Sequence, residues 1–491
     1  MKARDNMLAR LSALLGVSLT VSGCVVGPDY EKPALPLPTS WSFAGKATKE
    51  RSAPTLSAWW VRFKDPALDQ LIAMAVQSNK DVARAKAAVR EARATTAKEG
   101  GSLLPSASGS GSITRNRSQS TGAGIQDYTQ YQTGFDTSWE IDLFGGNRRT
   151  IEAARYSEQS SEEDLRDTLV TVIGDVASNY IQAREYQELT SLAQRSAISQ
   201  GRTAKLTRDQ IEVGFVSRVD VRKAEAQAAS TEADIPSHQI SYAKAVNRLS
   251  VLTATPSSDI EAMLSKRGRI PPPPGRTSVG IPATVLASRP DVRAAERELA
   301  QSTAKIGKAE ADRYPSFSLT GSIDSSSSSL SDLGKKSTIG WSWGPQISVP
   351  IFQGGQLKAA VDIAKAQRDQ KLMDYQATVL TAMEEIDNAI IAYNRSGTRL
   401  SAIEKSTRGY RDAAKLSREL FKSGENDLFD SLDADRSLYS AEEKLIEAKS
   451  DIATYYISLM KALGGGWDGA ANVSAPLVVD ENDGPHLSRL N

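Results

Sequence analysis

The chain has 491 residues, a formal net charge of +1 and 24% charged residues, so no overall basic field points to nucleic acid. One cysteine and two histidines exclude a disulfide within the chain and a histidine–cysteine metal cluster. Beyond the first two dozen residues, no apolar run is long enough for a membrane-spanning helix. We therefore expect no nucleic-acid partner, no metal and no cofactor.

The first residues have the organisation of a secretory signal. A basic stretch, residues 2–10, precedes a short apolar stretch, residues 11–21, and small residues then lead into Cys24. Small residues before a sole cysteine are similar to the lipobox of bacterial lipoproteins. This resemblance implies a signal peptide over 1–23 and acylation of Cys24, for example with palmitate, which would hold this end in a membrane leaflet. The alternative is a signal peptide whose cleavage region happens to contain a cysteine.

A proline-rich tether, residues 24–60, follows the cysteine and favours an extended spacer. The first helix is predicted to begin at Asp65, which suits the N-cap, with Pro66 at the first helical position. It is predicted to continue to about Lys98.

Two alternating stretches then predict strands. The first, residues 106–114, alternates small and apolar residues with serine, and it is a weak signal because Gly and Ser also form flexible loops. The second, residues 131–143, places Tyr131 and Trp139 on one face and polar residues on the other. Such a pattern is typical of a membrane strand with lipid on one side and water on the other.

A proline-free helix is predicted over residues 147–213, and a second over residues 217–252. Gly214 lies where a helix C-terminus favours the left-handed conformation. Ser217, with Asp220 three residues later, suits the N-cap of the next helix. The pattern therefore predicts a tight helix–helix reversal.

The same order of elements returns later in the chain. Four landmarks, Asp81, Pro105, Gly214 and Asp220, have counterparts 210 residues on, at Asp291, Pro315, Gly424 and Asp430. The second set comprises a first helix, strands over 316–324 and 341–351, a long helix over 356–422 and a helix over 427–463. A constant offset indicates an internal duplication. We expect repeats over 61–255 and 283–464, a proline-rich linker over 256–282 and a tail over 465–491.

Four strands in one chain cannot close a barrel. Lipid forbids an open sheet edge, because unpaired backbone groups there cost several kcal/mol each. The strands must therefore pair with those of other copies. Two copies would give about 8 strands with a filled interior, whereas three give 12 and four give 16, and either leaves a lumen. The residues alone predict three or more copies.

Several stretches resemble the TolC-type outer membrane efflux family: WWVRFKDPALDQLI, SRPDVRAAERELA, RYPSFSLTGS, VPIFQGGQLKAA and the two glycine-led helix turns. CVVGPDY resembles its NodT-like lipoprotein branch. The resemblance covers essentially the whole mature chain. It implies an α+β membrane protein of the Gram-negative outer membrane, a homotrimer whose 12-stranded β-barrel continues into a long periplasmic α-helical coiled-coil barrel.

The resemblance also implies a function. The family forms the exit duct for an inner-membrane pump, here of the RND type, reached through a periplasmic adaptor. It implies that the second helical hairpins close the periplasmic end at rest and that both turns meet the adaptor. The residues of the turns are Gly214 and Ser217 in the first and Gly424 and Asp427 in the second.

Candidate gate residues follow the second turn. Asp430 and Asp433 lie three apart, so one helix face presents both, and a threefold ring of these carboxylates would repel unless paired. Arg218 and Asp220 are candidate partners across the tips. Some relatives carry a basic residue where this chain has Asn426, so that gate link is missing here. A solvated charged face is the alternative for each of these residues.

Five aromatic residues of the predicted strands favour a lipid-facing or interfacial girdle over a core position: Tyr131, Trp139, Phe317, Trp341 and Trp343. The serine run 325–329 predicts an exposed loop at the outer mouth. His238 has no neighbours at metal-ligand spacing, which favours a surface or packing role.

No Walker loop, nucleotide fingerprint or nucleophile motif is present, so we expect a protein that is not an enzyme. Three hypotheses remain: a passive efflux duct for small molecules such as drugs or toxic compounds, an exit channel for a secreted polypeptide (type I secretion), and a non-conducting trimeric lipoprotein scaffold. The polar alternation of the strands favours a conducting pore. The exported substrate does not follow from the residues.

Overall fold

The computed structural model describes residues 25–36, 38, 40–41, 56–120, 124–212, 216–265, 268–275 and 282–468. The predicted signal peptide, Cys24, Gly214 and most of the predicted tail lie outside the described residues. The chain forms two compact units. The strand-bearing unit comprises residues 1–34, 89–161 and 294–376, and the helical unit comprises residues 35–88, 162–293 and 377–491.

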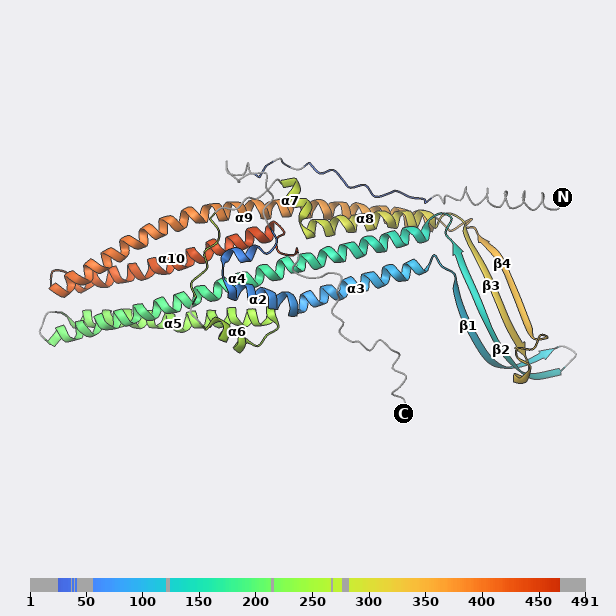
Figure 1. The fold of residues 1–491 in the computed structure, drawn as a ribbon, viewed down its shortest axis with the longest axis horizontal. Coiled ribbons are helices and arrows are strands. Elements are labelled where there is room, and N and C mark those ends of the chain that lie inside the picture. Colours follow the sequence, from blue (N-terminus) through green and yellow to red (C-terminus); the bar gives the residue numbers. More distant parts are fainter. Residues whose placement is uncertain are drawn as a thin grey trace. The chain divides into compact units, whose positions relative to one another are not determined.

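The strand-bearing unit holds one antiparallel sheet whose strands lie in chain order (Figure 1). The four strands are β1 (Ser106–Ser120), β2 (Gly124–Ile141), β3 (Ser316–Ser327) and β4 (Ile339–Ser348). Each strand pairs with the next without interruption of the register, from Ser106 opposite Ser138 to Ser120 opposite Gly124 in the first pair. Only β2 and β3 have a hydrogen-bonded neighbour on both sides, so β1 and β4 are the edges within one chain.

The strand ends differ from the prediction. β1 extends past Thr114 to Ser120, and β2 begins before Tyr131, at Gly124. The polar residues of the two added stretches pair with each other and so satisfy their backbone groups. β4 ends at Ser348 instead of residue 351, just before Pro350, which lacks an N–H for the ladder. The serine run was wrongly predicted as an exposed loop, because residues 325–327 belong to β3 and the Ser325 hydroxyl is buried against Thr338.

Nine helices of the described chain carry labels in Figure 1: α2 (Pro66–Ser78), α3 (Lys80–Gly101), α4 (Gly146–Glu212), α5 (Arg218–Thr253), α6 (Ser257–Leu264), α7 (Pro282–Ser288), α8 (Pro290–Ala311), α9 (Gln356–Ser423) and α10 (Leu428–Ala462). The ends of the four long helices lie within one residue of the prediction. With 67 and 68 residues, α4 and α9 would each be about 100 Å long at about 1.5 Å per residue.

The predicted first helix is two helices. Asn79 breaks it: its Oδ1 accepts hydrogen bonds from the backbone N–H groups of Asp81 and Val82, at 2.8 and 3.2 Å, and so caps α3. Its Nδ2 donates to the carbonyl oxygen of Leu252 at the end of α5, at 2.8 Å. The predicted linker 256–282 likewise contains a helix, α6.

The core of the helical unit contains an aromatic cluster. Trp59 lies in a short 3-10 helix, Trp59–Phe63, and packs edge-to-face against Tyr456 of α10 with ring centroids 6.0 Å apart. Phe63 contacts the same ring at 5.3 Å. The WWVRF stretch therefore anchors the start of the first repeat to the last helix. None of the helices in the described ranges combines the length and the apolar character that a membrane crossing requires.

Candidate functional site

One face of the sheet is polar except for the aromatic ring of Tyr128. The register puts the even-numbered residues of all four strands on this face, and seven of them border a hollow of about 320 Å³: Ser106, Ser108, Asp136, Ser138, Thr320, Ser322 and Ser342. Every charged side chain that the described strands place on this face is acidic, namely Asp136, Glu140 and Asp324. The face suits contact with water and is negatively charged.

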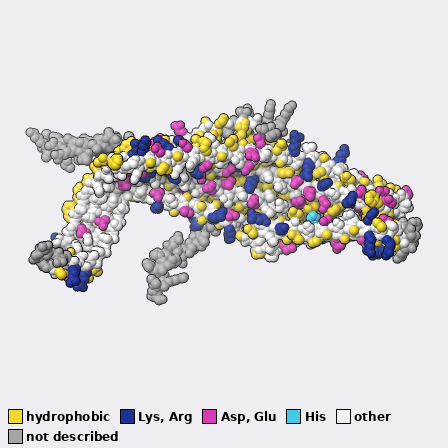
Figure 2. All heavy atoms as spheres, turned by 180° about the vertical axis from the view of Figure 1, so that it is seen from behind, with side chains coloured by type: hydrophobic (Ala, Val, Ile, Leu, Met, Phe, Trp, Pro, Cys, Tyr) yellow, Lys and Arg dark blue, Asp and Glu magenta, His cyan; other side chains and the backbone are white. Residues whose placement is uncertain are grey.

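The opposite face is apolar and exposed. Phe135, Trp341 and Trp343 keep 66, 70 and 72% of their surface accessible, and Figure 2 shows hydrophobic side chains along the sheet. All five predicted girdle aromatics lie on this face. Trp139 is anchored near one end, where its indole N–H donates to the Leu103 carbonyl at 3.0 Å. Exposed aromatics in such number indicate a surface that water does not cover.

The chain after β4 carries the most exposed apolar side chains of this unit. Ile351 and Phe352 are 91 and 87% accessible, and Val349 is 55% accessible. At the other edge of the sheet, Leu104 precedes β1 and is 68% accessible. Both edges of the sheet therefore present unpaired backbone groups and, at the same end, uncovered apolar side chains.

The segment after Cys24 is clamped against the base of the sheet. Arg149 of α4 is buried and donates to the carbonyl oxygens of Val26 (3.2 Å) and Gly27 (3.1 Å) and to the carboxylate of Asp29 (2.8 Å). Gly27 has φ +90° and lies so close to α8 that a Cβ on it would fall 2.3 Å from the Cα of Gly307. Only glycine fits both the backbone conformation and the space.

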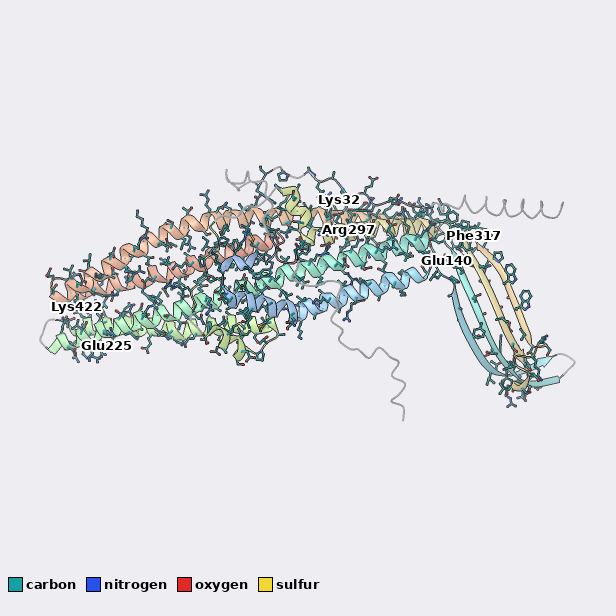
Figure 3. All side chains as sticks on the ribbon, viewed as in Figure 1. Lys32, Glu140, Glu225, Arg297, Phe317 and Lys422 are labelled. Carbon is teal, nitrogen blue, oxygen red and sulfur yellow. The ribbon has the colours of Figure 1, made fainter. Side chains whose placement is uncertain are left out.

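Further along, the same segment is held by a carboxylate. Glu296 of α8 accepts hydrogen bonds from the Tyr30 hydroxyl at 3.1 Å and from Lys32 Nζ at 2.6 Å. Arg297 also donates to it, and Figure 3 shows Lys32 near Arg297. The pKa of Glu296 is lowered because these bonds outweigh its burial. The segment that carries the motif CVVGPDY is thus attached to the rest of the strand-bearing unit by specific hydrogen bonds.

Arg149→Met is expected to release this segment. The substitution leaves two part-buried carbonyl oxygens without this donor, which costs about 1–3 kcal/mol locally. Hydrogen exchange at the Val26 amide, which donates to the Phe144 carbonyl, should accelerate strongly. Arg155→Met, on the exposed side of the same helix, is the matched control and should leave the exchange unchanged. Equal exchange rates in wild type and Arg149→Met would show that Arg149 does not hold this segment.

The first helix turn is capped as predicted. The Ser217 hydroxyl accepts from the Asp220 N–H at 3.3 Å, and the Asp220 carboxylate accepts from the Ser217 N–H at 2.9 Å. The hydrogen bonds from Ser217 lower the pKa of Asp220. Asp220 is therefore engaged in its own cap within the chain, whereas Arg218 beside it is exposed.

The second helix turn presents exposed carboxylates. Gly424 has φ +80° and Asp427 caps α10 by accepting from the Asp430 N–H at 2.9 Å. Asp430 and Asp433 are both exposed, and Asp433 accepts from Arg436 of its own helix at 2.6 Å. No base among the described residues pairs with the Asp430 carboxylate inside one chain. The structure does not bring Asp430 or Asp433 together with Arg218 or Asp220.

The two hairpins meet through residues that the sequence patterns did not single out. Ala204 and Ala224 of the first hairpin pack with Phe421 and Leu428 of the second. Within the second hairpin, Asp435 of α10 is 3% exposed and accepts a hydrogen bond from Arg418 of α9 at 2.6 Å. Burial raises the pKa of Asp435, and Arg418 opposes the rise. Asp435 lies at helical spacing on the apolar stripe of α10. A carboxylate in such a stripe is the sequence signal that could have identified this buried ion pair.

A polar contact between the two hairpins joins α5 to α10. The Tyr439 hydroxyl donates to Asp234 at 3.1 Å, and His238 Nε2 lies 3.9 Å from Glu443. Burial lowers the pKa of His238 and raises that of Glu443. His238 therefore packs between the hairpins, in line with the packing role expected for it. The described residues hold no group of three or more His, Cys, Asp or Glu side chains suited to a metal ion.

Asp167 of α4 has a raised pKa. Burial, and then the nearby charge of Asp291, raises its pKa from 3.8 to about 6, against the attraction of Arg289 and Lys461. Because the folded chain binds this proton more tightly than the unfolded chain, the associated stability is present at low pH and is lost as pH rises through about 6.

Asp167→Asn is therefore expected to stabilise the protein at pH 7.5 by on the order of 1–2 kcal/mol, after allowance for partial exposure. The gain should shrink as pH falls toward 4.5. Thermal unfolding at the two pH values measures it, with the exposed Asp209→Asn as control. A gain of equal size at both pH values would contradict the assignment.

The chain is similar to known outer membrane proteins over most of its length. The model of a family described as "Outer membrane efflux protein" matches residues 71–255 and 281–465, two ranges that are 210 residues apart at both ends. The chain is 35% identical to "Nodulation protein T" of Rhizobium leguminosarum bv. trifolii, over 92% of this chain and 97% of that protein. It is 33% identical to the solvent efflux pump outer membrane protein SrpC of Pseudomonas putida, over 92% and 98%.

Two solved structures show the same fold. The outer-membrane channel OprN superimposes with a TM-score of 0.84 and 31% identity, over 90% of this chain and 100% of that one. The open state of the Neisseria gonorrhoeae MtrE outer membrane channel gives a TM-score of 0.78 and 30% identity, over 90% and 99%. The predicted α+β fold, with four strands and long helices, is confirmed.

Proposed function

The chain belongs to the outer membrane efflux protein family, and from this membership we propose that it is the outer membrane exit duct of a tripartite efflux system. Family members are channel proteins, and the chain is not an enzyme. A duct supplies no energy of its own, so export through it depends on a pump. The observation that carries the proposal is a sheet with one continuous polar face, one exposed apolar face and two open edges.

We propose that three copies close the barrel. β1 and β4 each lack a partner on one side, and lipid does not tolerate unpaired backbone groups. If β4 of one copy pairs with β1 of the next, the exposed Ile351 and Phe352 come close to the exposed Leu104 of the neighbour. Three copies give about 12 strands, enough to leave a lumen lined by the polar face.

In this assembly the girdle aromatics face lipid and the long helices form the wall of a periplasmic tunnel. The lumen face offers mainly hydroxyl, amide and carboxylate groups, which suits passage of solutes with their water. Tyr128, opposite Asn116, is the one large aromatic side chain that the described strands place on this face. The relatives include outer membrane proteins of a solvent and a toluene efflux pump, which favours small toxic compounds over a secreted polypeptide.

We further propose that the chain is lipid-anchored. Cys24 lies outside the described residues, but the clamp begins at Val26, only two residues later. Acyl chains on Cys24 would therefore be held at the base of the sheet, where β2 and β4 end. The attachment gives the anchor a fixed position beside the barrel instead of a loose tether.

The helix turns are proposed to meet a periplasmic adaptor, and through it an inner-membrane pump of the RND type. The N-cap residues that follow the two turns, Ser217 and Asp427, are exposed, and each fixes the start of the next helix. The acidic pair Asp430 and Asp433 is proposed to restrict the opening at rest. No pairing partner for Asp430 lies in its own chain among the described residues, which leaves it available to a neighbouring copy.

A deletion strain tests the function directly. The strain should become sensitive to solvents and to several classes of drug, and expression of the wild-type chain should restore resistance. Accumulation of a fluorescent drug in whole cells measures the same loss. Unchanged sensitivity with loss of one secreted protein would favour polypeptide secretion. Unchanged sensitivity, together with purified protein that conducts no ions in bilayers, would favour the scaffold.

A further inference from the structure

A group of basic side chains lies on the apolar face of the sheet, beyond the aromatic residues and before Ile125. Arg115 and Arg117 follow Ile113 in β1 at spacings of two and four, so all three share the face that carries Trp341. Arg115 lies opposite Thr129, and Arg117 lies opposite Asp127. Figure 2 shows Lys and Arg side chains gathered at this end of the sheet.

The register gives the height of these arginines. On β2 the aromatic band of this face runs from Ile141 to Tyr131, ten residues along the strand, and Ile125 lies farther out, past Asp127. With about 3.3 Å per residue and a tilt of about 40°, this band is about 25 Å tall, the height of an apolar belt in outer membrane barrels. Arg115 lies one further step along this face, about 5 Å above the band, at the level of lipid headgroups.

The charges at this level are incompletely paired. Arg117 is 72% exposed at its side chain and contacts Asp127 at 3.0 Å. Arg115 is exposed, and no carboxylate of the described residues pairs with it. The connection between β3 and β4 adds the exposed Lys335 and Lys336, of which Lys335 bonds to Asp332. The lumen face of the described strands, in contrast, carries acids alone, and both strand arginines lie on the lipid side.

We propose that this basic patch, Arg115, Arg117 and Lys336, binds the phosphate groups of the phosphorylated glycolipid of the outer leaflet. Guanidinium forks bind phosphate oxygens through two parallel hydrogen bonds, and the planar fork loses little side-chain freedom for each bond that it forms. Ile113, 69% exposed just below, is placed to contact the acyl chains of the same lipid.

The proposal rests on the membrane placement proposed above. In the three-copy assembly β1 borders β4 of the next copy, so the connection before that β4 brings its Lys336 toward Arg115. One glycolipid at this seam would contact two chains. Binding would then favour the assembled trimer over separate chains.

The test compares lipid binding to the purified full-length protein in detergent by native mass spectrometry. The probes are diphosphorylated lipid A, its dephosphorylated form and phosphatidylglycerol. Wild type should bind the diphosphorylated form about tenfold or more tightly than the dephosphorylated form, and Arg115→Gln with Arg117→Gln should remove that preference. Arg202→Gln with Lys205→Gln, which removes two exposed charges of α4, should retain it.

Three results would overturn the proposal: no preference in wild type, an unchanged preference in Arg115→Gln with Arg117→Gln, or equally tight binding of phosphatidylglycerol. Asp127→Asn, which frees Arg117, provides a second variant and should tighten binding. Ion conductance of the double variant in bilayers without glycolipid should equal that of wild type. Loss of the lipid preference with intact conductance separates this proposal from the channel function.

Discussion

Ile323→Arg is expected to abolish insertion of the barrel. Ile323 lies near the middle of the apolar band, opposite Phe135 and Trp341, and is 50% exposed on the face assigned to lipid. An arginine near the bilayer midplane on that face costs about 2–4 kcal/mol per copy, and three copies incur it together. Protease resistance of the sheet in vesicles should fall to the level of unfolded protein.

The neighbouring residue provides the matched control. Ser322 lies one position away in β3 and points to the polar face, where its hydroxyl bonds to Ser342 at 2.9 Å. Ser322→Arg introduces the same side chain into water, so the barrel should insert with normal protease resistance. Its conductance should fall, because three arginines narrow an acidic lumen. If both variants insert, or if Ser322→Arg alone fails, the assignment of the two faces is wrong.

Asp430→Ala with Asp433→Ala is expected to raise the single-channel conductance several-fold in planar bilayers. The two acids are exposed at the start of α10, and six carboxylates of three copies would surround the opening. We expect them to hold neighbouring tips through bases such as Arg218, so their loss frees the tips. Asp427 is retained, so the N-cap of α10 is intact.

Asp209→Ala with Asp412→Ala removes the same charge from exposed sites earlier in α4 and α9 and should leave the conductance unchanged. Ionic strength gives a second check, since charge pairs at exposed tips are screened by salt. The difference between wild type and the double variant, normalised to bulk conductivity, should therefore shrink at high salt. Equal conductance of both proteins at all salt concentrations would remove the gate assignment.

The helices were predictable because local signals define their ends. Ser217 with Asp220, Asp427, and the glycine at 424 are caps that act within a few residues. The break at Asn79 was not predictable, because it depends on a hydrogen bond to Leu252, far away in the sequence. The added length of β1 and β2 has the same origin: their polar ends gain strand structure only from each other.

The site was predictable to a similar extent. Alternation placed the aromatics on one face and the polar side chains on the other without knowledge of the register. The clamp was not predictable, because Arg149 meets Val26 and Asp29 only in the folded unit. The buried Asp435 carried a signal, a carboxylate on an apolar stripe, but its partner Arg418 follows from the hairpin geometry alone.

The central claim is that three copies enclose one channel, and native mass spectrometry of the purified membrane protein tests it most directly. The sheet of one chain has two open edges, and the account predicts a single species with the mass of three mature, acylated chains. A species of one or two chains that still conducts ions in bilayers would contradict it, because neither could close the barrel around an open lumen.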